Sequence, residues 1–390
     1  MKGVASKILI ALGILLILAA ILWWAIAVNS LVKLPSDIDS VTEYEGTMTY
    51  YVDPISNQPL PEGEELQLDM KVERNITSNA DEFDSSRGVL DEEIVLDLGI
   101  QKQSMEFAYV LDRKSIENVK DDRAWAWDPA NVVDREGTYY PLLGFDVSKD
   151  ETYLIWKNEI DAGLEAEFID EQDLEGVTVY NFSSEIMVTD KKEVAPVYIE
   201  ALGLPAEMTF DDLKPSLQAL GVDVDGLLVV AQQVLSAEDQ QALGQVLQET
   251  VPANYYWAMD TKISVEPKTG LPVDVYKNVE SLYMELDMTK LAGLFTILNK
   301  YKDDPNLGPA LAQLEDLQVQ LAQAEPNKIF EYSYEQTDET VKDAVDEAKD
   351  SASKVNLVKV YIPWALLIVG ALILIIGLLI GGGRTQQPEA

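Results

Sequence analysis

Two long uncharged apolar segments stand near the two ends of this 390-residue chain. Residues 8–28 carry no charged side chain, and neither do residues 361–383, which consist mainly of Ile, Leu and Val. Each segment is long enough to cross a hydrocarbon layer of about 30 Å as a helix. No segment between them is both as long and as apolar. We therefore expect a membrane-spanning helix at each end, with the rest of the chain folded between them.

The basic residues that flank these segments predict their orientation. Lys2 and Lys7 precede the first segment, and Arg384 follows the second. Because basic flanks favour the cytoplasmic side of a membrane, we expect residues 1–7 and 384–390 in the cytoplasm. The large region between the two spans is then extracytoplasmic.

Aromatic residues at the ends of the spans agree with this orientation. One membrane–water interface is expected to carry a belt of aromatic side chains, namely Trp23, Trp24, Tyr361 and Trp364. Lys354 and Lys359 lie on the same flank and weigh against the orientation.

The first span has a second interpretation, which is a cleaved signal peptide. Residues 25–27 read Ala-Ile-Ala, a small-residue pattern that is typical of cleavage sites. However, the apolar run is longer than a usual signal core, and two adjacent tryptophans are atypical there. We therefore favour a retained anchor.

The charge of the chain is concentrated between the spans. The whole chain has a net charge of −39, whereas residues 29–360 hold 26 basic and 67 acidic residues, a net charge of −41. Such acidity argues against nucleic acid as a partner. It indicates either a solubilising surface or cation binding. The chain has no Cys and no His, which excludes disulfides, His-ligated metals and Ser-His-Asp catalysis. We expect no cofactor and no metal site.

Periodicity predicts an α+β fold, with a β-rich, antiparallel extracytoplasmic domain over residues 29–337. Residues 65–73 alternate strictly between polar and apolar types, as a half-buried strand does. Other segments are rich in Val, Ile, Tyr and Thr and are expected to form strands. These are residues 43–52, 92–98, 104–112, 152–156, 176–188, 255–266, 272–286 and 329–336.

Three regions have helical spacing instead. Residues 207–250 and 289–324 carry stripes of Leu and Val that are typical of core-facing helices, and Ser236 begins a capping pattern within the first region. The second stripe includes Leu311, with Leu314, Leu317 and Leu321 after it. Residues 338–360 form a charged amphipathic pattern, which predicts a stalk helix leading to the second span.

One turn pattern occurs twice. Residues 52–59 and 265–272 share the order Val-acid-Pro-x-hydroxyl-Asn/Gly-x-Pro, which predicts a hairpin turn with a capping acid and a left-handed residue. The repeat indicates either two related β-modules or a chance similarity.

Several short motifs, taken in order, point to a family. They are Leu-Asp-Arg-Lys-Ser at 111–115, Tyr-Tyr-Pro-Leu at 139–142, Lys-Asp-Glu-Thr-Tyr-Leu-Ile-Trp at 149–156, residues 174–182, and Val-Glu-Pro-Lys-Thr-Gly at 265–270. With the two terminal spans, they resemble the PorA-type porin family of cell-envelope proteins. The matching positions are Asp112, Arg113, Pro141, Tyr153, Trp156, Gly176, Tyr180, Phe182, Pro267, Thr269 and Gly270. Ser115, Tyr140, Leu142 and Lys157 depart from the family's pattern. The resemblance implies an envelope location and raises the question of a pore.

A pore meets a physical objection in this sequence. A transmembrane barrel needs about eight or more strands within the bilayer, but helical anchors place these strands outside it. Neither span carries Asp, Glu, Lys, Arg, Ser, Thr, Asn or Gln to line a water path. Gly377 and Gly381 form a small-xxx-small motif that favours association between spans. A pore would therefore need an oligomer or a path through the outer domain.

Other candidate sites are few. Asp223 and Asp225 suggest a calcium loop, but the remaining ligand positions are missing. Asn75 and Asn181 stand in glycosylation sequons, and Asn75 is the better candidate because Asn181 lies within a predicted strand. An aromatic cluster either binds carbohydrate or lipid or packs across strands, and packing is favoured. Its members are Trp125, Trp127, Tyr139, Tyr140, Tyr153 and Trp156.

These features support three hypotheses. The preferred one is a non-enzymatic membrane protein whose acidic domain has a structural or ligand-contact role at the cell surface. The alternative is an oligomeric pore or a conduit for lipids or other amphiphiles. An enzyme that uses carboxylates alone is the least favoured. The expected partners are the lipid bilayer, other copies of the chain or other envelope components.

Overall fold

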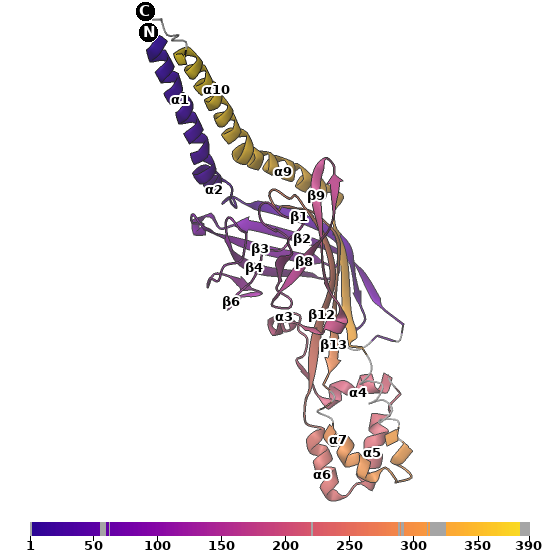
Figure 1. Ribbon diagram of the computed structural model, residues 1–390. Coiled ribbons are helices and arrows are strands. Elements are labelled where there is room, and N and C mark those ends of the chain that lie inside the picture. The colour runs from indigo at the N-terminus through magenta and orange to yellow at the C-terminus, as the bar shows by residue number, and fades with distance from the viewer. Residues whose placement is uncertain are drawn as a thin grey trace, which may run out of the picture.

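A computed structural model describes residues 2–54, 60–61, 63–219, 221–287, 289, 292–309, 311–312 and 325–382. It consists of a helical hairpin, a curled sheet and a small group of helices at the opposite end (Figure 1). Gly383 and the predicted cytoplasmic tail lie outside the described residues.

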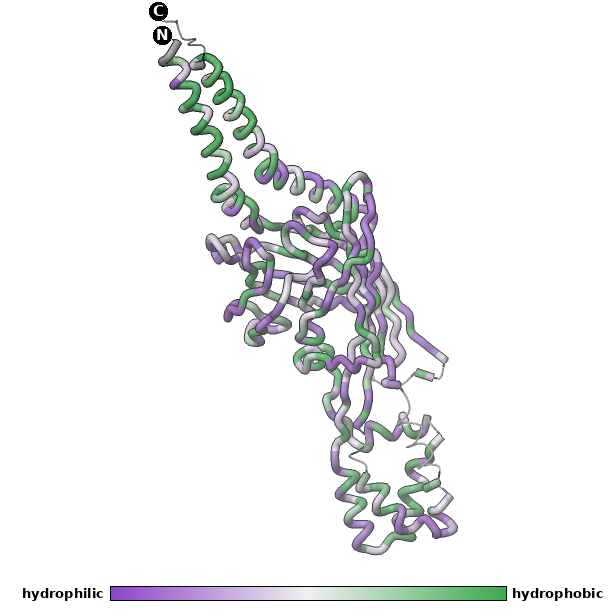
Figure 2. The backbone as a smooth tube through the Cα atoms, viewed as in Figure 1, coloured by the Kyte–Doolittle hydropathy of each residue, from purple (hydrophilic) through white to green (hydrophobic). Residues whose placement is uncertain are grey.

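The two apolar segments form a pair of long helices that lie side by side. The first comprises α1 (Lys2–Leu22), a π-helical segment η1 (Trp23–Ala27) and α2 (Val28–Leu31). The second comprises α9 (Asp338–Asn356), a π-helical segment η6 (Leu357–Tyr361) and α10 (Ile362–Gly382). By length and composition, Val4–Leu31 and Asp338–Gly381 each contain a candidate membrane span. The two termini lie together at one end of the molecule (Figures 1 and 2).

Small residues bring these two helices into close contact. A Cβ added at Gly13 would lie 2.7 Å from Leu374 N, and one added at Gly377 would lie 2.9 Å from Ile10 N. Ser6 Oγ donates a hydrogen bond of 2.7 Å to the Gly377 carbonyl. The small-residue motif is therefore used between the two spans of one chain, because only small side chains allow such close backbone approach.

The domain is built on one 14-stranded sheet in which every named pair of strands is antiparallel. The main path runs in the order β6-β5-β4-β3-β2-β1-β14-β13-β12-β9-β8-β7, with β10 and β11 paired to β12. The strands are β1 (Asp39–Tyr50), β2 (Leu66–Ser78), β3 (Arg87–Asp97), β4 (Lys102–Asp112), β5 (Trp125–Ala126), β6 (Asp128–Val132), β7 (Tyr153–Lys157), β8 (Ala162–Leu174), β9 (Val177–Ile186), β10 (Lys192–Glu193), β11 (Glu207–Met208), β12 (Val251–Val265), β13 (Pro272–Leu286) and β14 (Asn327–Gln336).

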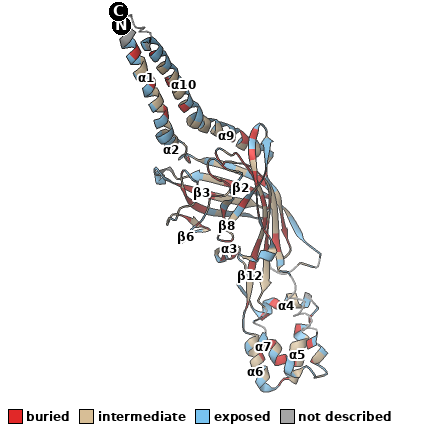
Figure 3. Ribbon diagram, viewed as in Figure 1, coloured by how far each residue is buried: buried red, intermediate tan, exposed pale blue. Residues whose placement is uncertain are grey.

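The sheet curls into a half-barrel (Figure 1), and many of its strand residues are buried (Figure 3), including most members of the largest hydrophobic cluster. The predicted α+β class with a β-rich antiparallel domain and helical insertions is confirmed. The first strand β1 and the last strand β14 are direct neighbours, so the two ends of the domain chain leave the sheet close to the paired helices.

The helical insertions gather at the end of the molecule farthest from the paired helices (Figure 1). They are α4 (Phe210–Ala219), α5 (Val224–Val234), α6 (Ala237–Val246) and α7 (Ala292–Leu298), with a core of their own. The short helix α3 (Pro196–Ala201) instead lies against the sheet. Within the described residues, 3₁₀ turns span Ala80–Glu82, Val188–Asp190 and Asn299–Tyr301. Ser236 caps α6 by accepting from Asp239 N at 3.2 Å, as its pattern predicts. Leu314, Leu317 and Leu321 lie outside the described residues.

The segment expected as a stalk forms helix α9, which lies against the sheet instead of standing free. Val345 and Ala348 are fully buried against Val177, Val179 and Val273 of strands β9 and β13. The amphipathic pattern of residues 338–360 therefore serves a tertiary contact.

One long strand, β8, was not predicted from the sequence. Its side chains alternate, with Ala166 buried and Phe168 partly buried, but the many acidic residues between them obscure the pattern. Most of the acidic residues of β8 are exposed to solvent, where their charges are tolerated.

The turn at residues 265–272 has the predicted chemistry. Glu266 Oε2 accepts hydrogen bonds from Lys268 N at 3.1 Å and Thr269 N at 2.9 Å, and Gly270 adopts a left-handed φ of 69°. Part of the first copy, residues 55–59, lies outside the described residues.

Candidate ligand cavity

A cavity of about 350 Å³ opens on the concave face of the half-barrel. Strands β1, β2, β3, β4, β13 and β14 form its walls, and residues near Tyr140, Trp156 and Tyr198 close it from the other side. Among its lining residues, Gln101 and Ala201 are exposed, so the cavity opens between the β3–β4 turn and the end of α3.

Strand alternation explains why one set of side chains faces the cavity. Successive side chains of a strand point to opposite faces, so every second residue of each wall strand lines the cavity. On β14, for example, the aromatic side chains of Phe330, Tyr332 and Tyr334 stack along the wall, with ring centroids 6.2 and 5.8 Å apart. The other strands contribute Tyr44, Met48, Tyr50, Met70, Val72, Arg74, Glu92, Ile94, Leu96, Gln103, Met105, Phe107 and Tyr109.

Much of the wall is therefore apolar and adaptable. Met48, Met70 and Met105 come from three different strands and face the same space as Phe330. Unbranched methionine side chains can shift to fit ligands of irregular shape. A wall of this composition suits a hydrocarbon chain.

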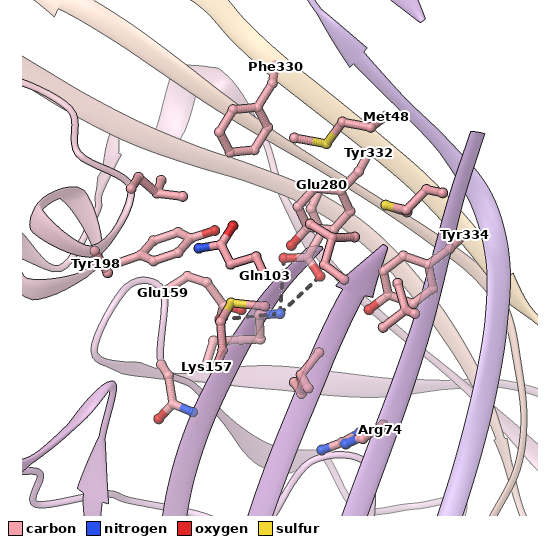
Figure 4. Close-up of a pocket in the computed structure, with 18 of the residues that line it drawn as sticks. Met48, Arg74, Gln103, Lys157, Glu159, Tyr198, Glu280, Phe330, Tyr332 and Tyr334 are labelled. Carbon is pink, nitrogen blue, oxygen red and sulfur yellow. Dashed lines mark hydrogen bonds and ion pairs between the residues drawn. The ribbon is translucent and has the colours of Figure 1, made fainter. Parts of the chain in front are cut away.

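A buried ion cluster lies at one side of the cavity (Figure 4). Lys157 Nζ donates to Glu280 at 3.0 Å and lies 3.4 Å from Glu159. Glu280 also accepts from the indole N–H of Trp257 at 2.8 Å and from Asn278 Nδ2 at 2.9 Å. The Glu280 carboxylate thus accepts hydrogen bonds from three different side chains.

The protonation of this cluster follows from its burial. Burial raises the pKa of Glu159, although the nearby Lys157 ammonium opposes the change. Burial alone would lower the pKa of Lys157, but Glu159 and Glu280 outweigh it and raise that pKa above its usual value. Lys157 therefore stays charged and pairs with Glu280, while Glu159 shifts toward its neutral form.

A second buried ion pair also lines the cavity, and its Arg74 lies over the same Tyr140 ring as Lys157, at 5.4 and 5.7 Å from the ring centroid. Arg74 Nε donates to Glu92, and Arg74 Nη2 donates to the Tyr140 carbonyl at 2.5 Å. Burial opposes the guanidinium charge, but Glu92 outweighs it and raises the pKa of Arg74 further. The next cation, Arg135, donates to the carbonyls of Ala108 and Trp125, each at 2.7 Å.

Several tyrosine hydroxyls facing the cavity make no hydrogen bond to any residue that the structure describes. They include those of Tyr198 on α3 and of Tyr332 and Tyr334 on β14, as well as those of Tyr50 and Tyr140. Burial raises the pKa of Tyr198, Tyr332 and Tyr334 well above the usual tyrosine value, so they stay neutral hydroxyls. Figure 4 shows Tyr198 reaching across the cavity toward Gln103.

The structure divides the predicted aromatic cluster between two roles. Tyr140 and Trp156 line the cavity. Trp127 instead stacks on Tyr198 with ring centroids 4.6 Å apart, and Tyr139 packs against Tyr109 at 4.5 Å. Trp125 lies in the short strand β5, and Tyr153 packs edge-on against Phe182 at 5.5 Å.

The family-motif residues mostly hold turns and junctions. Asp112 accepts from the backbone N–H groups of Lys114 and Ser115 at 2.8 and 3.0 Å. Gly270 has no space for a side chain, since an added Cβ would lie 1.8 Å from the Gly144 carbonyl. Of the other motif positions, Trp156 lines the cavity. The remaining ones do not line it, and they are Arg113, Pro141, Tyr153, Gly176, Tyr180, Phe182, Pro267 and Thr269.

The four interface aromatics come together at one end of the paired helices. Trp23 and Trp24 donate their indole N–H groups to the carbonyls of Val358 and Lys359, each at 2.9 Å. Trp24 also packs edge-on against Trp364, with ring centroids 6.0 Å apart. Tyr361 is exposed on the same turn.

The two sequon asparagines differ in their surroundings. Asn75 lies in β2 and donates to Glu73 at 2.9 Å, with its side chain partly exposed. Asn181 is only 1% exposed, and its amide is held by Asp170 and Ser264. The folded domain leaves no room for a glycan on Asn181.

No group of three or more Asp or Glu side chains that could hold a metal ion occurs within the described residues. Asp223 acts as a helix cap, since its carboxylate accepts from Gly226 N at 2.9 Å at the start of α5. This local role accounts for the acidic pattern at residues 223–225.

Several cavity residues had no recognisable signal in the sequence. Tyr198, Glu280 and Gln103 belong to no motif, and Lys157 marks a departure from the family pattern. Only the alternation of Tyr332 and Tyr334 within a strand indicated which face they would share.

The comparison with known proteins agrees with the fold. The family described as Porin PorA matches residues 5–379, which include both candidate spans and the whole sheet. No curated protein matches the chain significantly. Because the match covers nearly the full length of the sequence, the chain belongs to the Porin PorA family.

Proposed function

We propose that this protein is a membrane-anchored binding protein whose extracytoplasmic domain holds a single-chain amphiphile in the half-barrel cavity. The observation that carries the proposal is the cavity itself, whose lining combines apolar side chains with polar groups. Its volume of about 350 Å³ lies within the range of about 300–1,000 Å³ that is usual for small-molecule sites.

Both apolar and polar side chains line the cavity. The methionines Met48, Met70 and Met105 offer hydrocarbon contacts, whereas Lys157, Glu280 and the tyrosine hydroxyls lie where a head group would sit. A molecule with one chain and one polar head matches this division, because each part would meet a surface of its own polarity.

The orientation in the membrane is part of the proposal. Both termini lie at one end of the helical hairpin, and the aromatic residues lie at the other end, next to the domain. Lys2, Lys7 and Arg384 favour the cytoplasm for the termini. The cavity then lies outside the membrane, in a domain that can receive an amphiphile from the bilayer or from another envelope component.

The pore hypothesis is less well supported by the geometry. Gly13 and Gly377 are used within one chain, so these residues are not available to join several copies around a channel. Ser6 is already bonded to Gly377 and lines no water path. Membership in a porin family nevertheless makes conductance worth measuring.

The carboxylate-enzyme hypothesis is also less well supported. Glu159 and Glu280 lie near each other, since both contact Lys157. Glycosidases use two carboxyl groups that face the substrate. Here Lys157 lies between them, and Trp257 and Asn278 bind the remaining acceptors of Glu280. We therefore propose a non-enzymatic role.

The proposal is tested by comparing ligand binding of the parent chain with that of a variant whose cavity is filled by a larger side chain. The full-length chain in lipid nanodiscs is titrated with a fluorescent fatty-alcohol probe. Met105→Trp places a large ring in the cavity, and we expect it to weaken probe binding about tenfold or more, because the ring occupies ligand volume. Met187→Trp makes the same change at a methionine that is 56% exposed and outside the cavity, and should bind as the parent chain does.

Two results would overturn the proposal. One is equal probe binding by the parent, Met105→Trp and Met187→Trp chains, all with unchanged circular dichroism. The other is reproducible single-channel steps in planar bilayers that Met105→Trp does not alter, which would favour the pore.

A further inference from the structure

We infer that the amphiphile held in the cavity has an uncharged, hydroxyl-bearing head group, which the hydroxyls of Tyr198, Tyr332 and Tyr334 and the amide of Gln103 bind. This inference rests on the proposed function and adds the class of ligand. It follows from which polar groups of the cavity are occupied and which are free.

The charged groups that line the cavity are already paired with one another. Arg74 is paired with Glu92, and Lys157 with Glu280. The nearest further cation, Arg135, uses its N–H groups on backbone carbonyls and on Asn158 at 3.0 Å. A charged head group would have to break one of these pairs or remain unpaired, and both are costly in a buried site.

The surrounding charge acts against an anionic head in particular. Residues 29–360 carry a net charge of −41, so an anion must enter against the field of the whole domain. Burial also raises the pKa of Glu159, which means that negative charge is disfavoured beside the cavity.

The free polar groups are neutral and can both donate and accept. The hydroxyls of Tyr198, Tyr332 and Tyr334 have no hydrogen-bond partner among the described residues, yet they are not fully enclosed by protein. Within that part of the chain, Trp127 Nε1 is the one fully enclosed side-chain polar atom without a partner. The three hydroxyls therefore border open cavity space. The side chain of Gln103 offers an amide N–H₂ and a carbonyl on the opposite wall. Four such groups around one space match a head with several hydroxyl or ester oxygens.

The aromatic stack on β14 supports the same class. Phe330, Tyr332 and Tyr334 stack on one another along the wall, so a glycerol or sugar head could lie against the edge of the stack while its hydroxyls reach the tyrosine oxygens. The methionines that line the cavity near Phe330 would then contact the hydrocarbon chain of the ligand.

A competition series with one chain length tests the inference. Full-length protein in nanodiscs, loaded with the fatty-alcohol probe, is titrated with 1-decanoylglycerol, decanoate or decyltrimethylammonium. We expect 1-decanoylglycerol to displace the probe at concentrations about tenfold lower than either charged compound, because only its head needs no broken ion pair. Nanodiscs with the Met105→Trp chain give the background from lipid partitioning.

Removing hydroxyl groups identifies the residues. The double substitution Tyr332→Phe with Tyr334→Phe keeps both rings. We expect it to weaken 1-decanoylglycerol binding about tenfold and to weaken binding of the fatty-alcohol probe by less, because the single hydroxyl of the probe loses fewer hydrogen bonds. Tyr276→Phe removes a hydroxyl from a half-buried tyrosine of β13 outside the cavity and should have no effect.

The outcomes separate the two proposals. If the probe binds the parent chain and Met105→Trp prevents it, but the three competitors are equal or a charged one is preferred, the head-group inference is wrong and the cavity function stands. Unchanged 1-decanoylglycerol binding by the double tyrosine variant also contradicts the inference. If no probe binds at all, the proposed function itself fails.

Discussion

Arg113 connects the segment that follows the first apolar helix to the sheet. Its Nε and Nη2 donate to the Leu34 carbonyl at 2.9 and 2.7 Å, and its Nη1 donates to the Asp84 carbonyl at 2.8 Å. Leu34 follows directly on the first membrane helix and is buried in the core near β4. The planar guanidinium can reach both carbonyls at once, which a lysine ammonium cannot do.

Arg113→Lys should therefore destabilise the domain by about 2 kcal/mol, because a buried carbonyl loses its charged donor. Urea unfolding of the full-length protein in detergent, followed by tryptophan fluorescence, measures the change. Arg87→Lys is the matched control, since Arg87 is an exposed arginine paired with Asp121 and should change stability by less than about 0.5 kcal/mol. Equal midpoints for the two variants would contradict the role given to Arg113.

Asp274 is a residue whose burial makes stability depend on pH. Burial, with help from Glu335 and Asp338, raises the pKa of Asp274 from 3.8 to about 6. The folded state binds the proton more tightly than the unfolded state does, so its contribution is full below pH 3.8 and is lost as the pH rises through 6.

Asp274→Asn should raise the free energy of unfolding at pH 7 by about 1–2 kcal/mol, allowing for the partial exposure of the side chain. The same substitution should have no effect at pH 3.5, where the aspartic acid is already neutral. Unfolding midpoints at the two pH values measure this, with exposed Asp69→Asn as the control. A stabilisation that is equal at both pH values would show that the charge is not its cause.

At the scale of elements, the two π-helical segments η1 and η6 lie side by side and share hydrogen bonds. Pro363 has no N–H, so it cannot donate to the carbonyl of Lys359 four residues before it, and η6 forms at this point. The carbonyls of Val358 and Lys359 are instead bonded by the indoles of Trp23 and Trp24 from the other helix. Side chains of the first helix thus supply the hydrogen bonds that the backbone of the second helix lacks at this point.

Trp24→Phe should destabilise the helical pair by about 1 kcal/mol, because the Lys359 carbonyl loses its donor. In a Pro363→Ala background the same change should cost close to nothing, since the backbone N–H gained at position 363 replaces the indole. The chain has no Cys, so two introduced cysteines can carry dyes that report helix separation during SDS titration.

Trp364→Phe is the control for this pair, because its indole makes no hydrogen bond within the described part of the chain. If Trp24→Phe costs the same with and without Pro363, the two residues act independently and the explanation is wrong.

At the scale of the whole molecule, the charge of −41 between the spans sets the response to salt. Repulsion among exposed carboxylates opposes the compact state, and salt screens it because the Debye length falls to about 10 Å at 0.1 M. The domain should therefore unfold at higher temperature in 0.5 M than in 0.05 M NaCl.

Choline chloride separates screening from specific cation binding. Choline and sodium salts at equal ionic strength should raise the thermal midpoint equally if screening is the cause. A much larger effect of millimolar CaCl₂ would instead indicate bound cations, in contrast to the expected solubilising role of the acidic surface.

The elements of this fold could be predicted well where the signal is local. The strict alternation at residues 65–73 and the aromatic-rich pattern at 329–336 predict strands that the structure contains as β2 and β14. The strand β8 could not be recognised in the same way, because its acidic residues belong to a solvent-facing side that only the sheet order defines.

The candidate site could not be predicted to the same extent. Lys157 and Glu280 are 123 residues apart, and their contact depends on how β7 and β13 are placed around the curled sheet. Among 68 acidic residues, nothing local distinguishes Glu280 from an exposed glutamate. Its burial comes from Trp257 and Asn278, which are brought together by the pairing of β12 with β13.

The sequence by itself determined the two apolar helices, the family, and the strands that build the sheet, because each of these rests on the order of residues close together in the chain. Only the tertiary structure decided that the sheet curls into a half-barrel, that its inner faces leave a cavity, and which charges there are paired. The reason is physical, since cavities and buried ion pairs form between residues far apart in sequence, and their position is set by strand order and register.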